Sequence, residues 1–148
     1  MKTTVFLVGA GPGDPGLITV KAEKLLKIAD VIVYDYLSNP IFLNKANNNC
    51  KLINAGKRLG FKAMSQAQIN KKLVSLAKQK YKNIVRLKGG DPLLFGRGGE
   101  EAEYLKKNKI NFEIVPGITS AIAVPAYAGI PISHRDSTSS FCIVTGHE

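Results

Sequence analysis

The stretch that decides the fold of this chain spans residues 86–101 and reads Arg86-Leu87-Lys88-Gly89-Gly90-Asp91-Pro92-Leu93-Leu94-Phe95-Gly96-Arg97-Gly98-Gly99-Glu100-Glu101. The largely apolar residues 83–87 precede it, so an expected buried strand runs directly into a loop rich in glycine. Glycine lets the backbone approach a ligand closely, but it also loses more backbone entropy on folding than any other residue. The stretch therefore predicts a strand end that presents its backbone to a ligand.

Strand-like and helix-like segments alternate along the chain. Short β-branched or apolar segments predict strands at residues 4–8, 30–34, 51–54, 83–87, 112–115 and, last, 140–144. Helical periodicity predicts helices at residues 16–29, 39–46, 97–108 and 119–128, and another after the capping box of Ser65 and Gln68. This alternation indicates an α/β fold, with a mostly parallel five-stranded sheet and helices on both faces.

Three glycine-containing segments each follow an expected strand. They are residues 9–16, 89–92 and 116–120. In parallel sheets, ligands bind beyond the carboxyl ends of the strands, which meet at one edge. We therefore expect the three loops to form a single binding site.

The first of these loops resembles a dinucleotide-binding turn only in part. Gly9 and Gly11 begin a G-x-G-x-x-G pattern, and Asp35 stands at the end of the second expected strand, where an acid could bind a ribose. Asp14 occupies the place of the third glycine, and prolines interrupt the helix start that should receive a pyrophosphate. The pattern argues against an NAD site.

The composition is that of a globular domain with a basic surface. A chain of 148 residues can form one domain with a real core, and 45% hydrophobic and 22% charged residues are ordinary values. The net charge of +10 suits a polyanionic partner, although a lysine-rich solvated surface explains it equally well. Neither an arginine block nor an aromatic-interleaved basic stripe is present, so nucleic acid is not expected as a partner.

The sequence also indicates a cytoplasmic chain. No apolar run reaches the roughly 18 residues of a membrane helix, and the N-terminus lacks the long apolar region of a signal peptide. Cys50 and Cys142 have no metal-ligand spacing and are expected to be reduced thiols. We expect no membrane partner and no metal.

Several motifs resemble those of the tetrapyrrole methylases, and among them the uroporphyrinogen-III C-methyltransferases. The motifs cover nearly the whole chain in the family's order: VGAGPGDPGL at 8–17, residues 29–35, Gly56-Lys57-Arg58, VRLKGGDPLLFGRGGEE at 85–101, VPGITS at 115–120, AYAGIP at 126–131, His134-Arg135-Asp136 and VTGH at 144–147. The Gly-Lys-Arg and His-Arg-Asp signatures and the block that opens at Arg86 are the most specific of these.

The resemblance implies a methyltransferase that uses S-adenosylmethionine. Its reaction would methylate uroporphyrinogen III at C2 and C7 to give precorrin-2, on the way to sirohaem and cobalamin. A pyrrole carbon would attack the methyl group in line, so the protein mainly positions two substrates and excludes water. The residues that match the family's S-adenosylmethionine positions are Pro12, Gly89, Gly90, Asp91, Leu94, Thr119 and Ser120. For Asp91, an Asp-Pro turn is the alternative role.

The resemblance also assigns catalytic and substrate-binding residues. Asp35 matches the position proposed as proton acceptor, with a turn or cap residue as the alternative. Lys57 matches the proposed proton donor, and a clamp for a substrate carboxylate is about as reasonable. Uroporphyrinogen carries eight carboxylates, so basic residues suit it as partners. Those expected to bind substrate are Arg58, Arg97, His134 and Arg135.

The chain departs from the family pattern in its length and in two details. The family's unit continues after VTGH into a second α/β domain, so residues 1–148 are expected to be the first domain, inactive or nearly so alone. Lys62 and Tyr36 stand where many relatives have histidine and arginine, respectively. The resemblance also implies a homodimer, which is the usual assembly in the family. The alternatives are a precorrin or ribosomal-RNA methyltransferase of the same superfamily, and a non-catalytic module that binds S-adenosylmethionine or a tetrapyrrole.

Overall fold

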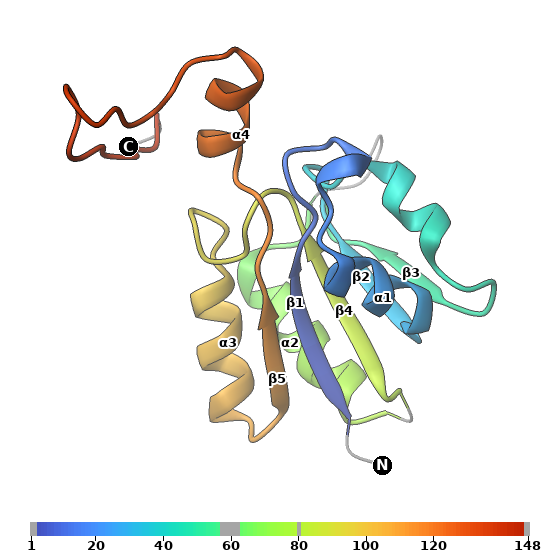
Figure 1. Ribbon diagram of the computed structural model, residues 1–148. Coiled ribbons are helices and arrows are strands. Elements are labelled where there is room, and N and C mark those ends of the chain that lie inside the picture. Colours follow the sequence, from blue (N-terminus) through green and yellow to red (C-terminus); the bar gives the residue numbers. More distant parts are fainter. Residues whose placement is uncertain (1–2, 57–62, 80, 147–148) are drawn as a thin grey trace.

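A five-stranded parallel sheet forms the centre of the computed structural model, which describes residues 3–56, 63–79 and 81–146. The strands are β1 (Thr4–Gly9), β2 (Val31–Tyr34), β3 (Lys51–Asn54), β4 (Asn83–Lys88) and β5 (Asn111–Val115). Their order across the sheet is β3-β2-β4-β1-β5, and every pairing is parallel. The expected α/β fold with a five-stranded sheet is confirmed (Figure 1).

Each helix except α3 begins at a residue whose side chain caps it. They are η1 (Pro15–Leu17), α1 (Val20–Ile28), η2 (Pro40–Lys45), α2 (Gln66–Ala77), α3 (Gly98–Lys107) and α4 (Ser120–Tyr127). The Ser65 hydroxyl accepts a hydrogen bond from the Gln68 backbone N–H, and the Gln68 side-chain oxygen accepts one from the Ser65 backbone N–H, which completes the expected capping box. The helix expected at 16–29 begins later, because Thr19 caps α1. The one expected at 39–46 is a 3₁₀ helix that starts at Pro40.

Two apolar cores cover the two faces of the sheet. On one face, side chains such as Leu7 and Val33 pack against α2 and α3 through Leu73 and Leu105. On the other, Val8, Ile32 and Leu87 pack against α1 and η2 through Leu26 and Phe42. Successive strand residues alternate between the two cores, as the pleat requires. Figure 1 shows α1 and α2 on opposite sides of the sheet, as expected.

The last expected strand is wrong. Residues 140–144 form neither a strand nor a helix, and they belong to a segment that leads away from the sheet beyond α4 (Figure 1). Alternating apolar residues make a strand only when a neighbouring strand completes the hydrogen-bond ladder. Here the sheet ends at β5, and Phe141 and Val144 are exposed.

Among the described residues, we find no helix with the length and apolarity to cross a membrane.

Candidate functional site

The loops that follow β1, β4 and β5 meet at the carboxyl edge of the sheet. Gly11 and Gly90 exchange two backbone hydrogen bonds, of 3.2 and 2.8 Å, which tie the first two loops together. The Asp91 carboxylate accepts a hydrogen bond of 3.1 Å from the Gly117 backbone, which ties in the third. The structure thus brings the three glycine-containing segments together, as the sequence predicted.

Three glycines allow these loops to pack backbone against backbone. A Cβ atom on Gly9 would lie 2.5 Å from the Gly90 carbonyl oxygen and 2.6 Å from the Gly117 Cα. A Cβ atom on Gly117 would overlap the same carbonyl. Sequence reasoning assigned the glycines to ligand approach alone. The structure adds that Gly9 and Gly117 are required for the loops to reach one another at all.

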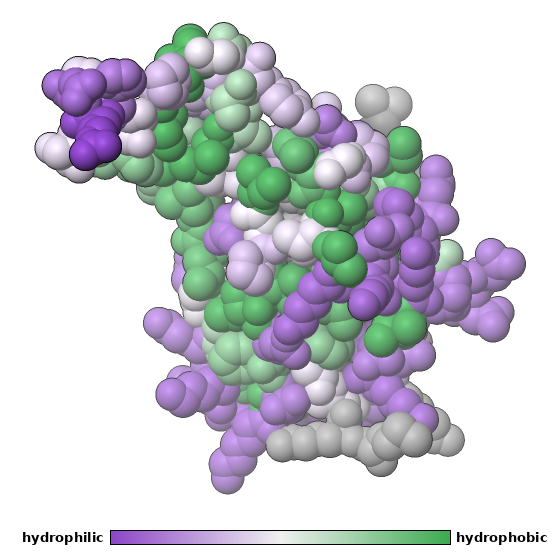
Figure 2. Space-filling view, in the orientation of Figure 1, coloured by the Kyte–Doolittle hydropathy of each residue, from purple (hydrophilic) through white to green (hydrophobic). Residues whose placement is uncertain are grey.

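A cavity of about 650 Å³ opens among these loops and α4. All seven residues expected to bind S-adenosylmethionine line it: Pro12, Gly89, Gly90, Asp91, Leu94, Thr119 and Ser120. Leu37, Val124 and Val144 add apolar wall. The volume lies within the usual range for a small-molecule site, roughly 300–1,000 Å³. In Figure 2, apolar side chains gather over α4 and the loops beside it, whereas hydrophilic ones dominate the lower part of the molecule.

Asp91 has a structural role in its loop as well as a place in the cavity wall. One carboxylate oxygen accepts backbone hydrogen bonds from Leu93 at 2.8 Å and Leu94 at 3.2 Å. The other accepts the bond from Gly117. The turn role considered from the sequence is therefore present. The carboxylate charge still borders the cavity, where it suits a cationic ligand.

Asp35 is held by two neighbours at the end of β2. One of its carboxylate oxygens accepts a hydrogen bond of 3.0 Å from an Arg86 Nη2, and the other accepts one of 3.2 Å from the Ser38 hydroxyl. The Asp35 side chain is 24% exposed, whereas that of Arg86 is 2% exposed. Leu37 in the same turn lines the cavity and packs on Gly89. Asp35 itself is not among the residues that line the cavity; its carboxylate is fixed in the turn that brings Leu37 to the cavity wall.

A buried charge cluster that sequence reasoning missed lies under this carboxylate. Glu101 of α3 is fully buried, and its Oε1 accepts bonds of 3.1 Å from Arg86, Lys88 and Gln66. Its Oε2 has no hydrogen-bond partner among the described residues. Burial, and then the nearby Arg86 charge, lower the pKa of Lys88. The available signal was two cations at alternate positions of an apolar strand, which places both on one face.

Arg97, His134 and Arg135 do not line the cavity. Arg97 precedes α3 and forms a two-bond ion pair, at 2.7 and 2.8 Å, with Glu100. His134 and Arg135 are exposed in the segment beyond α4. Lys57 and Arg58 lie outside the described residues. In the part of the chain that the structure describes, no three His, Cys, Asp or Glu side chains gather as a metal site.

A side-chain hydrogen bond connects α4 with the first loop. The Tyr127 hydroxyl donates a hydrogen bond of 2.6 Å to the Asp14 carboxylate. This bond lowers the pKa of Asp14 and raises that of Tyr127. Because both elements border the cavity, the contact helps to set the position of its α4 wall.

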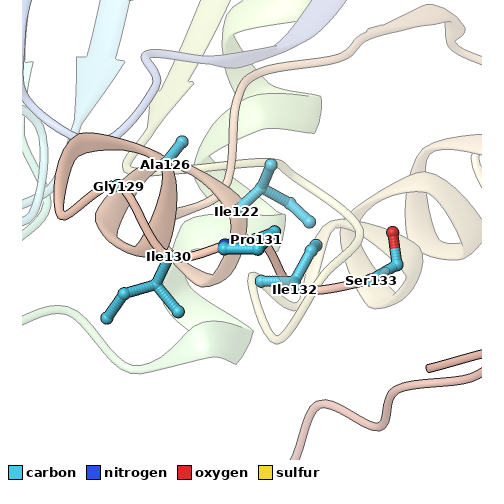
Figure 3. Close-up of a pocket in the computed structure, with 7 residues that line it drawn as sticks. All are labelled: Ile122, Ala126, Gly129, Ile130, Pro131, Ile132 and Ser133. Atoms are coloured by element: carbon cyan, nitrogen blue, oxygen red, sulfur yellow. The ribbon is translucent and has the colours of Figure 1, made fainter. Parts of the chain in front are cut away.

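A second cavity, of about 420 Å³, lies between α4 and residues 129–133 (Figure 3). Its lining is apolar except for Ser133, with Ile122, Pro131 and Ile132 gathered on it. Because no charged or acid–base side chain lines this cavity, it offers little chemistry. The cavity among the three loops is the better candidate site.

A comparison with known protein families agrees with the fold. Residues 4–148 match the family model described as Tetrapyrrole (Corrin/Porphyrin) Methylases. The match covers nearly the whole chain, which therefore belongs to the tetrapyrrole methylase family.

Particular relatives narrow the similarity further. The S-adenosyl-L-methionine-dependent uroporphyrinogen III methyltransferase of Methanosarcina barkeri is 58% identical over 144 residues, which are 97% of this chain and 56% of that protein. The uroporphyrinogen-III C-methyltransferase of Methanocaldococcus jannaschii is 57% identical over 148 residues, covering 100% of this chain and 61% of that protein. The Thermus thermophilus uroporphyrin-III C-methyltransferase, complexed with S-adenyl homocysteine, matches with a TM-score of 0.75 at 40% identity, covering 93% of this chain and 53% of that one. The chain thus spans between about half and three fifths of these proteins.

Proposed function

We propose that this chain is the S-adenosylmethionine-binding domain of a uroporphyrinogen-III C-methyltransferase that forms precorrin-2. One observation carries the proposal. All seven residues expected to bind the methyl donor, drawn from three separate loops and the start of α4, line a single cavity. The names of the similar proteins, two of which include the donor or its demethylated form, support the same function.

The residues of the cavity fit S-adenosylmethionine chemically. Gly90 has a left-handed backbone (φ 61°), and a Cβ on it would approach only the Thr119 Cα, at 3.8 Å, so its backbone is open on the cavity side. Asp91 brings negative charge, and Leu94 with Pro12 brings apolar surface. When bound, the donor supplies an electrophilic methyl group. The chain would hold the donor and exclude water, so that a substrate carbon meets the methyl group in line.

Asp35 is proposed to accept the proton that the substrate must lose once a ring carbon has been methylated. The Asp35 side chain is 24% exposed, and its ionised carboxylate only accepts hydrogen bonds. The turn that carries it contributes Leu37 to the cavity wall. Lys57 is proposed as proton donor, and Arg58, Arg97, His134 and Arg135 as partners of the substrate carboxylates. The last three lie outside the cavity wall, where a bulky octa-anion could extend.

The proposal also covers the cellular location, the assembly and the partners of the enzyme. We infer a cytoplasmic homodimer with a tetrapyrrole substrate and without metal, nucleic-acid or membrane partners. The net charge of +10 then serves the polyanionic substrate by raising its local concentration. A second α/β domain following these residues would complete the donor site.

The test uses the protein as encoded, including any sequence beyond residue 148. S-adenosylhomocysteine is titrated calorimetrically, with NADH as the control ligand, and turnover of uroporphyrinogen III is followed by formation of precorrin-2. We expect binding of S-adenosylhomocysteine, no binding of NADH, and two methyl transfers per substrate. Binding without transfer to uroporphyrinogen III would favour a non-catalytic module or a methylase for another substrate.

A further inference from the structure

The buried charge cluster has a feature that stability alone does not explain. Arg86 lies in the middle of the sheet with a 2% exposed side chain, and its guanidinium contacts Glu101 behind it and Asp35 in front of it. Buried ion pairs are costly to desolvate, and well-packed apolar side chains of similar size often serve stability as well or better. A role in orienting another group is a better account of the cluster.

The geometry makes Arg86 a rigid bridge. Its Nε donates to Glu101 at 3.1 Å, and one Nη donates to the carbonyl oxygens of Leu87 and Val33, at 3.1 and 3.4 Å. These bonds leave the other Nη free to meet Asp35 at 3.0 Å. Glu101 comes from α3, on the far side of the cluster from the Asp35 turn. The guanidinium therefore cannot swing without breaking bonds to three separate partners.

We propose that Arg86, anchored by Glu101, is a positioning residue that holds the Asp35 carboxylate in the orientation required for proton removal. This inference rests on the proposed function and deepens it. Arg86 is not among the residues that line the cavity, and it acts through Asp35. Ser38 completes the arrangement, because its buried hydroxyl reaches the other Asp35 oxygen and the Leu87 carbonyl, each at 3.2 Å. Proton removal tolerates little misplacement, since a shift of about 1 Å can cost about 10²-fold in rate.

The experiment must separate orientation from folding. Arg86→Met alone would leave Glu101 without one of its two cationic partners in the core, which destabilises the fold. The pair variant Arg86→Met/Glu101→Gln removes one positive and one negative charge together, and the new amide keeps an oxygen that accepts a hydrogen bond from Lys88. Lys88→Met is the matched control, because it disturbs the same cluster without touching the Asp35 ion pair.

Five forms of the protein as encoded are compared: wild type, the pair variant, Asp35→Asn, the pair variant combined with Asp35→Asn, and Lys88→Met. We expect the pair variant to fold by circular dichroism and to bind S-adenosylhomocysteine within about threefold of wild type. Its kcat should fall about 10²-fold, with little change in KM for uroporphyrinogen III. In the Asp35→Asn background the pair substitution should cause no further loss, because both changes disable one carboxylate. Lys88→Met should keep kcat within a few-fold.

Three outcomes overturn the inference, and the activity of the wild type distinguishes the last of them from the first two. If the wild type is active and the losses from the pair variant and Asp35→Asn multiply, Arg86 does not act through Asp35. The same conclusion follows if the folded pair variant keeps its kcat. If the wild type binds S-adenosylhomocysteine but transfers no methyl group to uroporphyrinogen III, the proposed function fails, and the positioning role falls with it.

Discussion

At the scale of single residues, the site depends on glycines, because they have no Cβ atom. Gly9, Gly90 and Gly117 come from three loops, and the first and last have no room for a Cβ atom against the Gly90 carbonyl. The close contact of three backbones places their polar groups around one cavity without long side chains between them. A glycine can thus be necessary for a binding site without touching the ligand.

Gly117→Ala is expected to damage both folding and binding. Its Cβ would overlap backbone atoms of Gly90 and Gly9, which cannot rotate away as a side chain can, so the free energy of unfolding should fall by about 1–3 kcal/mol. Separation of the loops should also weaken binding of S-adenosylhomocysteine by roughly tenfold. Urea unfolding and calorimetric titration measure the two effects.

Gly99→Ala is the control for this substitution. Gly99 lies in α3 with open space around its Cβ position, so alanine should leave binding unchanged and raise stability by about 0.5–1 kcal/mol. Equal behaviour of the two variants would show that crowding at Gly117 is unimportant.

At the scale of elements, the position of α4 depends on a contact with the loop after β1. The helix carries Ser120 and Val124 of the cavity wall, and its Tyr127 reaches Asp14 beside η1. An exposed hydrogen bond of this kind contributes little to global stability. Its use is to link two sides of one cavity.

The strength of this link should depend on pH in a defined way. The pKa of Asp14 is lowered in the folded chain, so its contribution is present above the ordinary aspartate pKa and is lost as pH falls through the lowered value. The pKa of Tyr127 is raised, so its contribution is present below the ordinary tyrosine pKa and is lost as pH rises through the raised value. The link should therefore hold at neutral pH and open at both extremes.

Phenolate absorbance during an alkaline titration tests the link. We expect Tyr127 to titrate at lower pH in Asp14→Asn than in wild type, because the carboxylate that accepts the hydrogen bond of its hydroxyl group is absent. Tyr127→Phe identifies the Tyr127 step, and Asn keeps the side-chain oxygen that accepts from the Gly16 backbone. An unchanged titration in Asp14→Asn would mean that the hydrogen bond does not form in solution.

At the scale of the whole molecule, the candidate site is open on its apolar side. Leu37, Val124 and Val144 line the cavity yet are 78%, 62% and 79% exposed, respectively. Large apolar side chains exposed together mark a surface that binds something. The similar proteins are about 1.6 to 1.9 times as long as the part that matches, which leaves ample chain for a covering domain.

Residues 1–148 alone are therefore expected to be a poor enzyme. Compared with the protein as encoded, if that is longer, the isolated chain should bind S-adenosylhomocysteine at least about tenfold more weakly, a loss of about 1.4 kcal/mol, and show no turnover of uroporphyrinogen III. Parallel calorimetry and turnover assays measure this difference. Turnover by residues 1–148 at the rate of the longer protein would contradict it.

Much of this molecule could be predicted from its sequence. Periodicity and caps such as Ser65 act within a few residues, so the five strands, the long helices and the position of the loops could be read along the chain. Parallel strands bring their carboxyl ends to one edge, so the meeting of residues 9–16, 89–92 and 116–120 followed from fold class. The residues of the cavity were then available from the family resemblance.

What only the tertiary structure decided is which groups meet across strands and loops. Arg86 reaches Asp35 because β4 lies beside β2 with Val33 opposite Arg86. The order of strands in the sheet cannot be predicted from the sequence pattern of any one strand. Glu101 falls in the first turn of the helix expected at 97–108, where acids are common, yet it is the buried anchor of that arginine. The sequence places Gly117 in a loop, and the structure shows that its backbone contacts those of Gly9 and Gly90. The alternation at 140–144 failed for the same reason, since a strand exists only if a neighbour is beside it.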